Sequence, residues 1–361
     1  MHPTPLLIAH RGASAYRPEH TLAAYALAIA QGADFIEPDF VATADGELIA
    51  RHENALAILH EDHSLDTTSS STDVHTRPEF AARLTTKSVD GVTVRGWFSE
   101  DFTLAEIKTL RATERIPALR PGNCAYNGEF AIPTLAEIVA LVRASAAHTG
   151  RPIGLYPETK HPTYFAREGR RLTGEPIGID LGLTLVQALQ ALDFTDPAQI
   201  FIQSFEPTYL QVLATQRLPA AGYKVPLIQL IEGHGAPRDW AAAGDCRTYA
   251  DLLTPQGLAY TAGYAAGVGV PKDLVITARG EVTPLVAAAH AAGLAVYVWT
   301  FRPENYFLPA AYRQGNSPAM DGDLAGELAQ HLGVGIDGFF IDSPDVGQRV
   351  RLAAAAARSS P

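Results

Sequence analysis

The chain has 361 residues, and its 28 Lys and Arg residues against 39 Asp and Glu residues give a formal net charge of −11 at pH 7. Such a charge repels polyphosphate backbones, so we expect no nucleic-acid partner. Hydrophobic residues make up 47% of the chain, which excludes a disordered protein. The most apolar stretch, around 285–299, is interrupted by His290 and Gly293, so we expect no stable membrane insertion. The first residues show no signal-peptide pattern.

The start of the chain alternates short apolar runs with one helical repeat. Residues 6–9 predict a first strand, and a repeat that begins at Pro18 predicts a helix after it. Residues 35–40 and 48–50 predict the second and third strands, and His52 closes the third.

Residues 53–131 lose this order and are polar, with one helix predicted near 103–113. We interpret them as an insertion subdomain after the third strand. Strand and helix patterns then alternate again. Further strands are predicted at 153–158, 199–203, 225–231, 294–299 and 337–341, with a short accessory strand at 273–277. Further helices are predicted at 134–146, 182–192, 207–216, 282–292 and 323–332.

Strands that alternate with helices pair in parallel. Setting the accessory strand aside leaves eight main strands, which favours one closed TIM (β/α)8 barrel domain over residues 1–361. An open, doubly wound sheet is the alternative. The absence of a Gly-x-Gly-x-x-Gly motif after the first strand counts against the dinucleotide-binding form of that sheet.

Titratable side chains stand at the carboxyl ends of the first four predicted strands. They are His10, Glu37, Asp39, His52 and Glu158. In a barrel these strand ends converge on one face, where active sites are built. We therefore expect the five side chains to share one site.

The three acids among them indicate a metal site. Glu37 and Asp39 lie two residues apart on one strand, so their carboxylates point to the same side and repel each other unless a cation joins them. Glu158 adds a third oxygen ligand, and no cysteine lies nearby to suggest zinc. Three carboxylates favour a hard cation, Ca²⁺ or Mg²⁺. Pro38 is tolerated only at a strand end or bulge, which supports a site there.

The basic residues around these acids point to phosphate chemistry. His10 and His52 are the candidates for general acid and base, because imidazole titrates near neutral pH. Arg11 offers a planar fork of donors for phosphate oxygens, and Lys160 adds a positive charge on the same rim. The alternatives are that Arg11 only pairs with a carboxylate such as Glu19 and that Lys160 is only solvated. Together with a cation, these groups fit a phosphodiester better than a sugar.

Several short motifs occur in a fixed order along the chain. They are His10-Arg11-Gly12, Pro18-Glu19-His20-Thr21, Glu37-Pro38-Asp39, Thr43-Ala44-Asp45-Gly46, His52, Glu158-Thr159-Lys160 and Gln203-Ser204-Phe205. In this order they resemble the glycerophosphodiester phosphodiesterases. The chain is most similar to the longer, periplasmic-type branch, which carries a large insertion after the second histidine, here with Thr72-Asp73-Val74 and Gly96-Trp97-Phe98.

The resemblance implies a TIM barrel that hydrolyses glycerophosphodiesters, such as glycerophosphocholine and glycerophosphoethanolamine, to sn-glycerol 3-phosphate and an alcohol. In the family, the glycerol hydroxyl of the substrate is thought able to attack phosphorus and give a cyclic phosphate that water opens. The implied roles are Ca²⁺ or Mg²⁺ ligation by Glu37, Asp39 and Glu158, acid/base catalysis by His10 and His52, and phosphate contact by Arg11 and Lys160. The family's second histidine is usually followed by Asp, whereas Glu53 follows it here, which leaves the role of that acid open.

Three further residues are candidates for lining the substrate pocket, namely Gln203, Phe205 and Trp299. Phe205 and Trp299 offer an apolar wall for the glycerol or the head group, and core packing explains them almost as well. Arg302 and Glu304 lie at a comparable strand end. The segment His60–Asp66 is rich in histidine and acids, and we interpret it as a solvated loop, not as a second metal site.

Other functions would keep the same barrel. Phospholipase D-like cleavage of lysophospholipids or sphingolipids favours an apolar, basic rim, which the net charge and the polar insertion do not provide. A non-catalytic barrel that binds phosphate esters would be signalled by loss of a histidine or acid, and none is missing. A sugar isomerase would leave Arg11 and Lys160 without a purpose.

The sequence leaves the head group and the oligomeric state open. Cys124 and Cys246 lack metal-type spacing, and any role of theirs is open too. As written, the chain indicates a cytoplasmic protein. A chain whose leader had been trimmed would be periplasmic or secreted.

Overall fold

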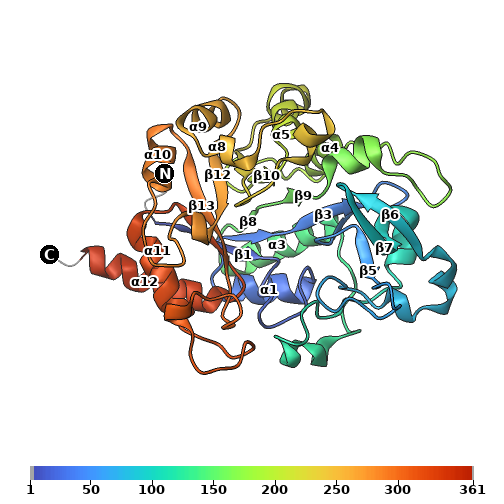
Figure 1. The fold of residues 1–361 in the computed structure, drawn as a ribbon, viewed down its shortest axis with the longest axis horizontal. Coiled ribbons are helices and arrows are strands. Elements are labelled where there is room, and N and C mark those ends of the chain that lie inside the picture. Colours follow the sequence, from blue (N-terminus) through green and yellow to red (C-terminus); the bar gives the residue numbers. More distant parts are fainter. Residues whose placement is uncertain (1–3, 360–361) are drawn as a thin grey trace.

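A ring of parallel strands forms the centre of the molecule (Figure 1). The computed structural model describes residues 4–359, and no helix in that range is long and apolar enough to cross a membrane. Six strands of the ring run without interruption. They are β1 (Leu6–His10), β10 (Ile202–Ser204), β11 (Leu227–Leu230), β12 (Gly267–Pro271), β13 (Ala295–Phe301) and β14 (Gly338–Ile341).

Two further strands, each broken near its middle, close the ring. They consist of β2 (Phe35–Glu37) with β3 (Asp39–Ala42), and of β8 (Gly154–Leu155) with β9 (Glu158–Thr159). β2 pairs in parallel with β1 and β8, while β3 pairs with β9, which continues to β10. The amide of Glu158 donates to the carbonyl of Pro38, which carries the pairing across both breaks. The described residues therefore form an eight-stranded ring, and the expected TIM (β/α)8 class is confirmed.

Two strand predictions were wrong in detail. β4 (Leu48–Ala50) is a strand, but it pairs antiparallel with β3 outside the ring. A short turn separates the two, whereas a parallel partner needs a crossover of about a dozen residues. The strand expected at 273–277 is absent, because residues 272–274 form a 3-10 turn. The ring strand that the sequence analysis missed is β12, because its two glycines weaken the strand pattern.

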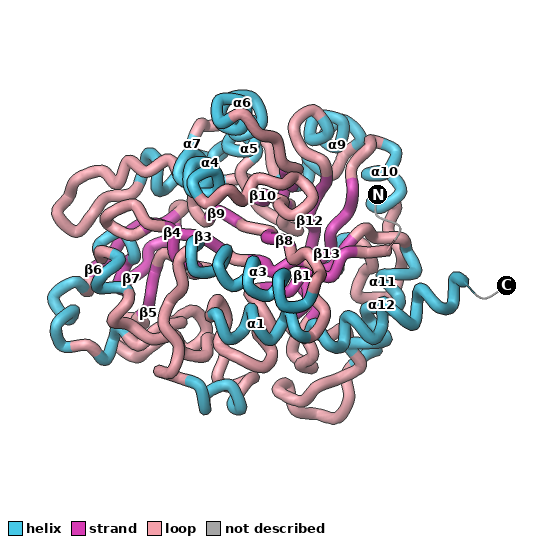
Figure 2. The backbone as a smooth tube through the Cα atoms, turned by 180° about the vertical axis from the view of Figure 1, so that it is seen from behind, coloured by secondary structure: helices cyan, strands magenta, loops and turns pink. Residues whose placement is uncertain are grey.

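Helices cover the outside of the ring, and Figure 2 shows α1 and α3 side by side over the strands. The helices are α1 (Leu22–Ala30), α3 (Leu135–Thr149), α4 (Leu181–Ala191), α5 (Pro207–Val212), α6 (Leu218–Ala221), α7 (Arg238–Ala242), α8 (Tyr249–Leu252), α9 (Pro255–Ala262), α10 (Leu285–Ala291), α11 (Leu324–Val334) and α12 (Pro344–Ser359). The sequence did not predict α7 to α9. The side chain of Thr134 accepts from the Glu137 amide, while Glu137 bonds back to the Thr134 amide, so a capping box starts α3.

The segment 53–131 builds a small sheet beside the barrel (Figure 1). Its strands β5 (Ala55–Ile58), β7 (Val92–Phe98) and β6 (Thr85–Val89) pair antiparallel in that order. The helix expected near 103–113 is limited to α2 (Leu104–Ile107). The segment follows β4, as expected, and so separates the second and third strands of the ring.

Side chains of the ring strands fill the barrel interior below the carboxyl ends. They are Leu6, Ile8, Phe35, Tyr156, Phe201, Ile228, Tyr297 and Phe340. The residues between them, such as Leu7 and Ala9, pack outward in a larger cluster with the helices. Side chains alternate between the two faces of a strand, so the residue two positions beyond an interior one also points inward.

Gly154 shows how tightly this interior is packed, because a Cβ built on it would lie 2.0 Å from Cε1 of Phe35. We expect Gly154→Ala to lower the free energy of unfolding by ~1–3 kcal/mol, since overpacking forces neighbouring side chains off their rotamers. Gly333→Ala in α11 is the control, because its Cβ would meet no atom within 4 Å. Helix propensity should make it neutral or stabilising by up to ~1 kcal/mol. Urea unfolding followed by circular dichroism measures both, and equal losses would contradict the packing argument.

Candidate active site

The carboxyl ends of the ring strands surround a cavity of about 1010 Å³. The alternation of the strands directs polar side chains into it, because His10 follows the interior residue Ile8 by two positions and Glu37 follows Phe35 in the same way. All ten side chains that the sequence singled out line this cavity. They are His10, Arg11, Glu37, Asp39, His52, Glu158, Lys160, Gln203, Phe205 and Trp299.

The three acids lie together at the floor of the site. Glu37, Asp39 and Glu158 are buried and offer ligand atoms that lie within 4.8 Å of one another. Burial, and then the neighbouring Asp39 carboxylate, raises the pKa of Glu37 well above its usual value. Burial also raises the pKa of Glu158 to about 7. Oδ1 of Asp39 has no hydrogen-bond partner within the described chain. This set of oxygen donors fits a hard divalent cation.

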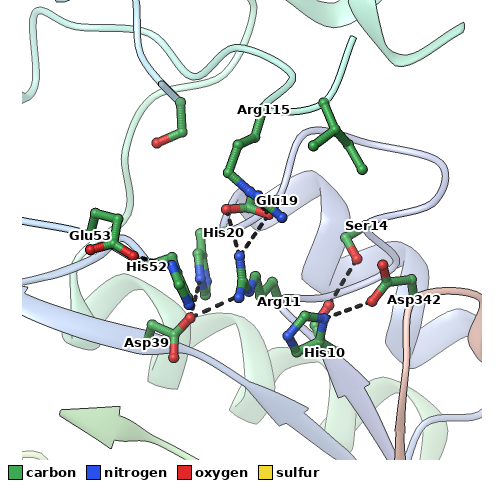
Figure 3. Close-up of polar contacts among 12 residues, drawn as sticks. His10, Arg11, Ser14, Glu19, His20, Asp39, His52, Glu53, Arg115 and Asp342 are labelled. Carbon is green, nitrogen blue, oxygen red and sulfur yellow. Dashed lines mark hydrogen bonds and ion pairs between the residues drawn. The ribbon is translucent and has the colours of Figure 1, made fainter. Parts of the chain in front are cut away.

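Arg11 is tied to carboxylates on two sides (Figure 3). Its Nη1 donates to both oxygens of Glu19 at 3.1 Å, and its Nε lies 3.4 Å from Oδ2 of Asp39. Arg115, from the 53–131 segment, adds a bond of 3.0 Å to Glu19. Pairing with Glu19, the alternative that the sequence left open, therefore occurs, while Arg11 also lines the cavity.

His20 contacts the acid cluster, and the sequence analysis gave this residue no role. Its ring is fully buried, with Nε2 at 2.9 Å from Oδ2 of Asp39 and Nδ1 at 2.8 Å from the hydroxyl of Tyr25. An imidazole that orients a carboxylate in this way is typical of the groups behind metal ligands. The motif Pro18-Glu19-His20-Thr21 contained the signal, but its spacing alone did not indicate the contact.

His10 is oriented by a carboxylate that the sequence analysis also missed. Its Nδ1 lies 2.7 Å from Oδ1 of Asp342, the residue that follows β14 (Figure 3). Burial, and then the positive charge of Arg11, lowers the pKa of His10 to about 4, so the ring is neutral at neutral pH. Asp342 follows the strand predicted at 337–341, so the rule that found the other candidates would have found it too.

His52 has a defined tautomer. Its Nδ1 lies 2.7 Å from Oε1 of Glu53, and its Nε2 lies 3.3 Å from Nζ of Lys160. An ammonium group only donates, so Nε2 accepts and Nδ1 carries the proton toward Glu53. Burial, and then the positive charges of Arg11 and Lys160, lowers the pKa of His52 to about 3. Glu53 occupies the position after the second histidine, where the family pattern has Asp, and its carboxylate contacts the ring of His52.

The remaining candidates form the wall of the cavity. Phe205 and Trp299 are half-buried, and their rings pack edge to face with 6.0 Å between the ring centroids. Both also pack against core clusters, so the wall and the packing interpretations describe the same two side chains. Nε2 of Gln203 donates to Glu37 at 3.2 Å. Arg302 lines the cavity as well, whereas Glu304, the other residue noted at that strand end, does not line it and accepts from Arg120.

Two features noted in the sequence lie outside the cavity. The segment with His60, Glu61, Asp62 and His63 is exposed at these four residues, and among the described residues it contains no cluster of side chains arranged as metal ligands. Cys124 and Cys246 are both free thiols.

A parallel barrel with its titratable groups gathered at the carboxyl ends of the strands is the architecture of an α/β-barrel enzyme. Residues 10–346 match the sequence profile of the glycerophosphoryl diester phosphodiesterase family. The chain belongs to this family, and it is a phosphoric diester hydrolase, as the motifs predicted.

Relatives support the assignment over nearly the whole chain. Glycerophosphodiester phosphodiesterase GDPD6 of Arabidopsis thaliana is 32% identical over 346 residues, which cover 94% of this chain and 83% of that protein. The glycerophosphodiester phosphodiesterase of Haemophilus influenzae is 28% identical over 366 residues, covering 95% and 88%.

Solved structures share the fold. A Silicibacter pomeroyi protein has a TM-score of 0.61 at 21% identity, covering 98% of this chain and 95% of its own. An Oleispira antarctica phosphodiesterase, solved with the product sn-glycerol-3-phosphate, has a TM-score of 0.56 at 19% identity, with 96% of both chains covered.

Arg120 braces the acid behind His10. It is buried, its Nε donates to Glu304 at 2.5 Å, and its Nη2 donates to Asp342 at 2.5 Å. We expect Arg120→Met to lower the free energy of unfolding by about 3 kcal/mol, because it leaves buried carboxylates short of a counter-charge. Arg349→Met is the control, since the Arg349 side chain is 68% exposed and its ion pair should contribute less than ~1 kcal/mol. Denaturant titration measures both, and similar losses would contradict the role of burial.

Proposed function

We propose that this enzyme hydrolyses glycerophosphodiesters with small, water-soluble head groups, such as glycerophosphocholine and glycerophosphoethanolamine, to sn-glycerol 3-phosphate and an alcohol. One observation carries the proposal. A single cavity holds two neutral imidazoles, a cluster of three carboxylates, and the cations Arg11 and Lys160. These are the groups that a phosphodiester requires for binding and for proton transfer at both of its ester oxygens.

The proposed cofactor is a divalent cation, Ca²⁺ or Mg²⁺, held by Glu37, Asp39 and Glu158. The fit is supported by the burial of the three carboxylates and by the unpartnered Oδ1 of Asp39. When bound, such an ion neutralises charge on the non-bridging phosphate oxygens.

The two histidines perform the proton transfers in this proposal. One Nε2 accepts the proton of the attacking hydroxyl, from the substrate's glycerol or from water. The other ring first takes a proton from solvent at its Nε2 and gives it to the leaving alkoxide, and the base returns its own proton to solvent afterwards. A new P–O bond forms as the bond to the head-group oxygen breaks. Asp342 and Glu53 hold Nδ1 of the two rings, and each carboxylate stabilises the imidazolium that forms when Nε2 takes a proton. Arg11 and Lys160 hold the phosphate.

Hydrolysis of glycerophosphocholine should require added Ca²⁺ or Mg²⁺ and should fall by about 10²–10⁴-fold in His10→Ala or His52→Ala, since a positioned acid or base contributes that much. A coupled assay of glycerol 3-phosphate release measures the rate. His290→Gln, a ring bonded to Asp337 on the outside of the barrel, is the control and should keep the wild-type rate.

Calorimetry should show weaker cation binding by Asp39→Asn in the absence of substrate. Turnover that persists in EDTA would contradict the metal. Cleavage of lysolipids without cleavage of glycerophosphodiesters would contradict the substrate class.

The acidic limb of the kcat/KM profile should lie unusually low. A general base must be neutral, and the pKa of His10 is lowered to about 4 and that of His52 to about 3 by burial and neighbouring cations. Between pH 8 and about pH 5, loss of the base should therefore not lower kcat/KM as the pH falls, whichever ring is the base. A decline of kcat/KM toward pH 8 would report the ring that must be protonated as the acid. Steady-state kinetics over that range test this, with circular dichroism to show that the protein stays folded. A limb centred near the ordinary histidine pKa of ~6.5 would overturn the expectation.

A further inference from the structure

His161, which follows the phosphate-site residue Lys160, joins two carboxylates at the edge of the cavity. Its Nε2 lies 3.1 Å from Oε2 of Glu53, and its Nδ1 lies 2.6 Å from Oδ2 of Asp90. Each ring nitrogen faces a carboxylate, so both must carry a proton and the ring is a cation. Burial opposes the charge, but the hydrogen bonds to Asp90 and Glu53 outweigh it and raise the pKa of His161 to about 10.

The backbone of His161 also indicates that its position is imposed. Its φ is 54°, in the left-handed region that costs a residue with a Cβ roughly 1 kcal/mol. Such a conformation persists when the surrounding structure holds it, and here two charge-assisted hydrogen bonds hold the ring.

Asp90 reaches the cavity because of the turn that carries it. Val89 pairs with Val92, so Asp90 and Gly91 form a two-residue hairpin turn between β6 and β7, with φ values of 48° and 85°. Asp-Gly is a preferred pair in such a turn, because both positions need a positive φ. The tip of the small sheet therefore places a carboxylate against a loop of the barrel.

Glu53 receives a hydrogen bond at each of its oxygens. Oε1 contacts Nδ1 of His52 at 2.7 Å, and Oε2 contacts His161 at 3.1 Å. Glu is one methylene longer than the Asp of the family pattern, and the extra length lets the carboxylate span two rings. A carboxylate held at both oxygens has little freedom to rotate away from His52.

We propose that His161, braced by Asp90, is a positioning residue that fixes Glu53 and through it the ring of His52. The inference rests on the proposed role of His52 in hydrolysis. In this proposal, Asp90 at the hairpin tip of the 53–131 segment helps to position the catalytic ring of His52.

The test compares His161→Gln with Asp90→Asn. Asn is also favoured at the first position of the turn, so Asp90→Asn keeps the hairpin and removes only the negative charge. We expect each variant to lower kcat for glycerophosphocholine by about 10- to 100-fold with KM within about twofold, because a catalytic group displaced by ~1 Å loses that much rate. His290→Gln is the matched control, since that ring is also bonded to an aspartate, at 2.8 Å, away from the cavity.

A second readout follows the ring itself. Nitrogen NMR of His52 should show the Nδ1-protonated tautomer in the wild type and a mixture of tautomers in both variants. A network that only stabilised the fold would change the unfolding midpoint and leave kcat and the His52 signals unchanged.

The outcomes separate the two hypotheses. Wild-type kcat in a folded His161→Gln would overturn the positioning role, and if that variant does not fold, wild-type kcat in Asp90→Asn would do so. If the wild type cleaves no glycerophosphodiester, the proposed function fails on its own. The His52 spectra then decide the positioning role, and identical spectra in wild type and Asp90→Asn would overturn it.

Discussion

Side chains of a β-strand alternate between two faces, and closing a sheet into a ring turns one of those faces inward. This constraint places the whole site. Phe35, Tyr156 and Phe340 pack in the barrel interior, and each is followed two residues later by an acid. Glu37 and Glu158 line the cavity, and Asp342 lies beside His10. The apolar rings close the interior below, so the polar side chains stand above a layer of apolar side chains. The pairing of β3 with β9 sets Asp39 beside Glu158, and one oxygen of each of Glu37, Asp39 and Glu158 lies within 4.8 Å of the others.

The 53–131 segment belongs to this site as much as the ring does. Arg120 bonds to Asp342, which holds His10. Asp90, at the tip of the small sheet, bonds to His161. The segment therefore supports the orienting carboxylate of each histidine from outside the barrel. The strands of the ring fix the backbone positions of the site residues, but long side chains at the cavity can still adopt several rotamers. Contacts from the inserted segment restrict these rotamers.

The ring and most of the site could be predicted from the sequence because both follow short-range rules. Alternating strands and helices predicted the barrel, and strand ends predicted His10, Glu37 and Glu158. β12 was missed because glycines carry no side-chain pattern, although they suit a strand whose neighbours approach closely. The Asp90-Gly91 turn carried a readable hairpin signal that the polar composition around it concealed.

Contacts between distant segments were beyond the sequence. Arg120 and Glu304 meet across 184 positions, and no local pattern pairs them. The role of Glu53 was open for the same reason, because its second partner, His161, lies 108 residues away. A spacing rule shows which strand end a residue occupies, but it does not show which charge from another segment will face that residue.

The charges behind the two histidines explain how each ring is both oriented and neutral. A carboxylate hydrogen-bonded to an imidazole normally favours the protonated ring. Here each carboxylate shares its charge with a cation, Asp342 with Arg120 and Glu53 with His161. Burial and Arg11 then outweigh what remains of the attraction, and the pKa of each ring falls. The hydrogen bond fixes the tautomer while the shared charge leaves Nε2 unprotonated. This is the state that the ring acting as general base requires, and the ring acting as general acid must first take up a proton at Nε2.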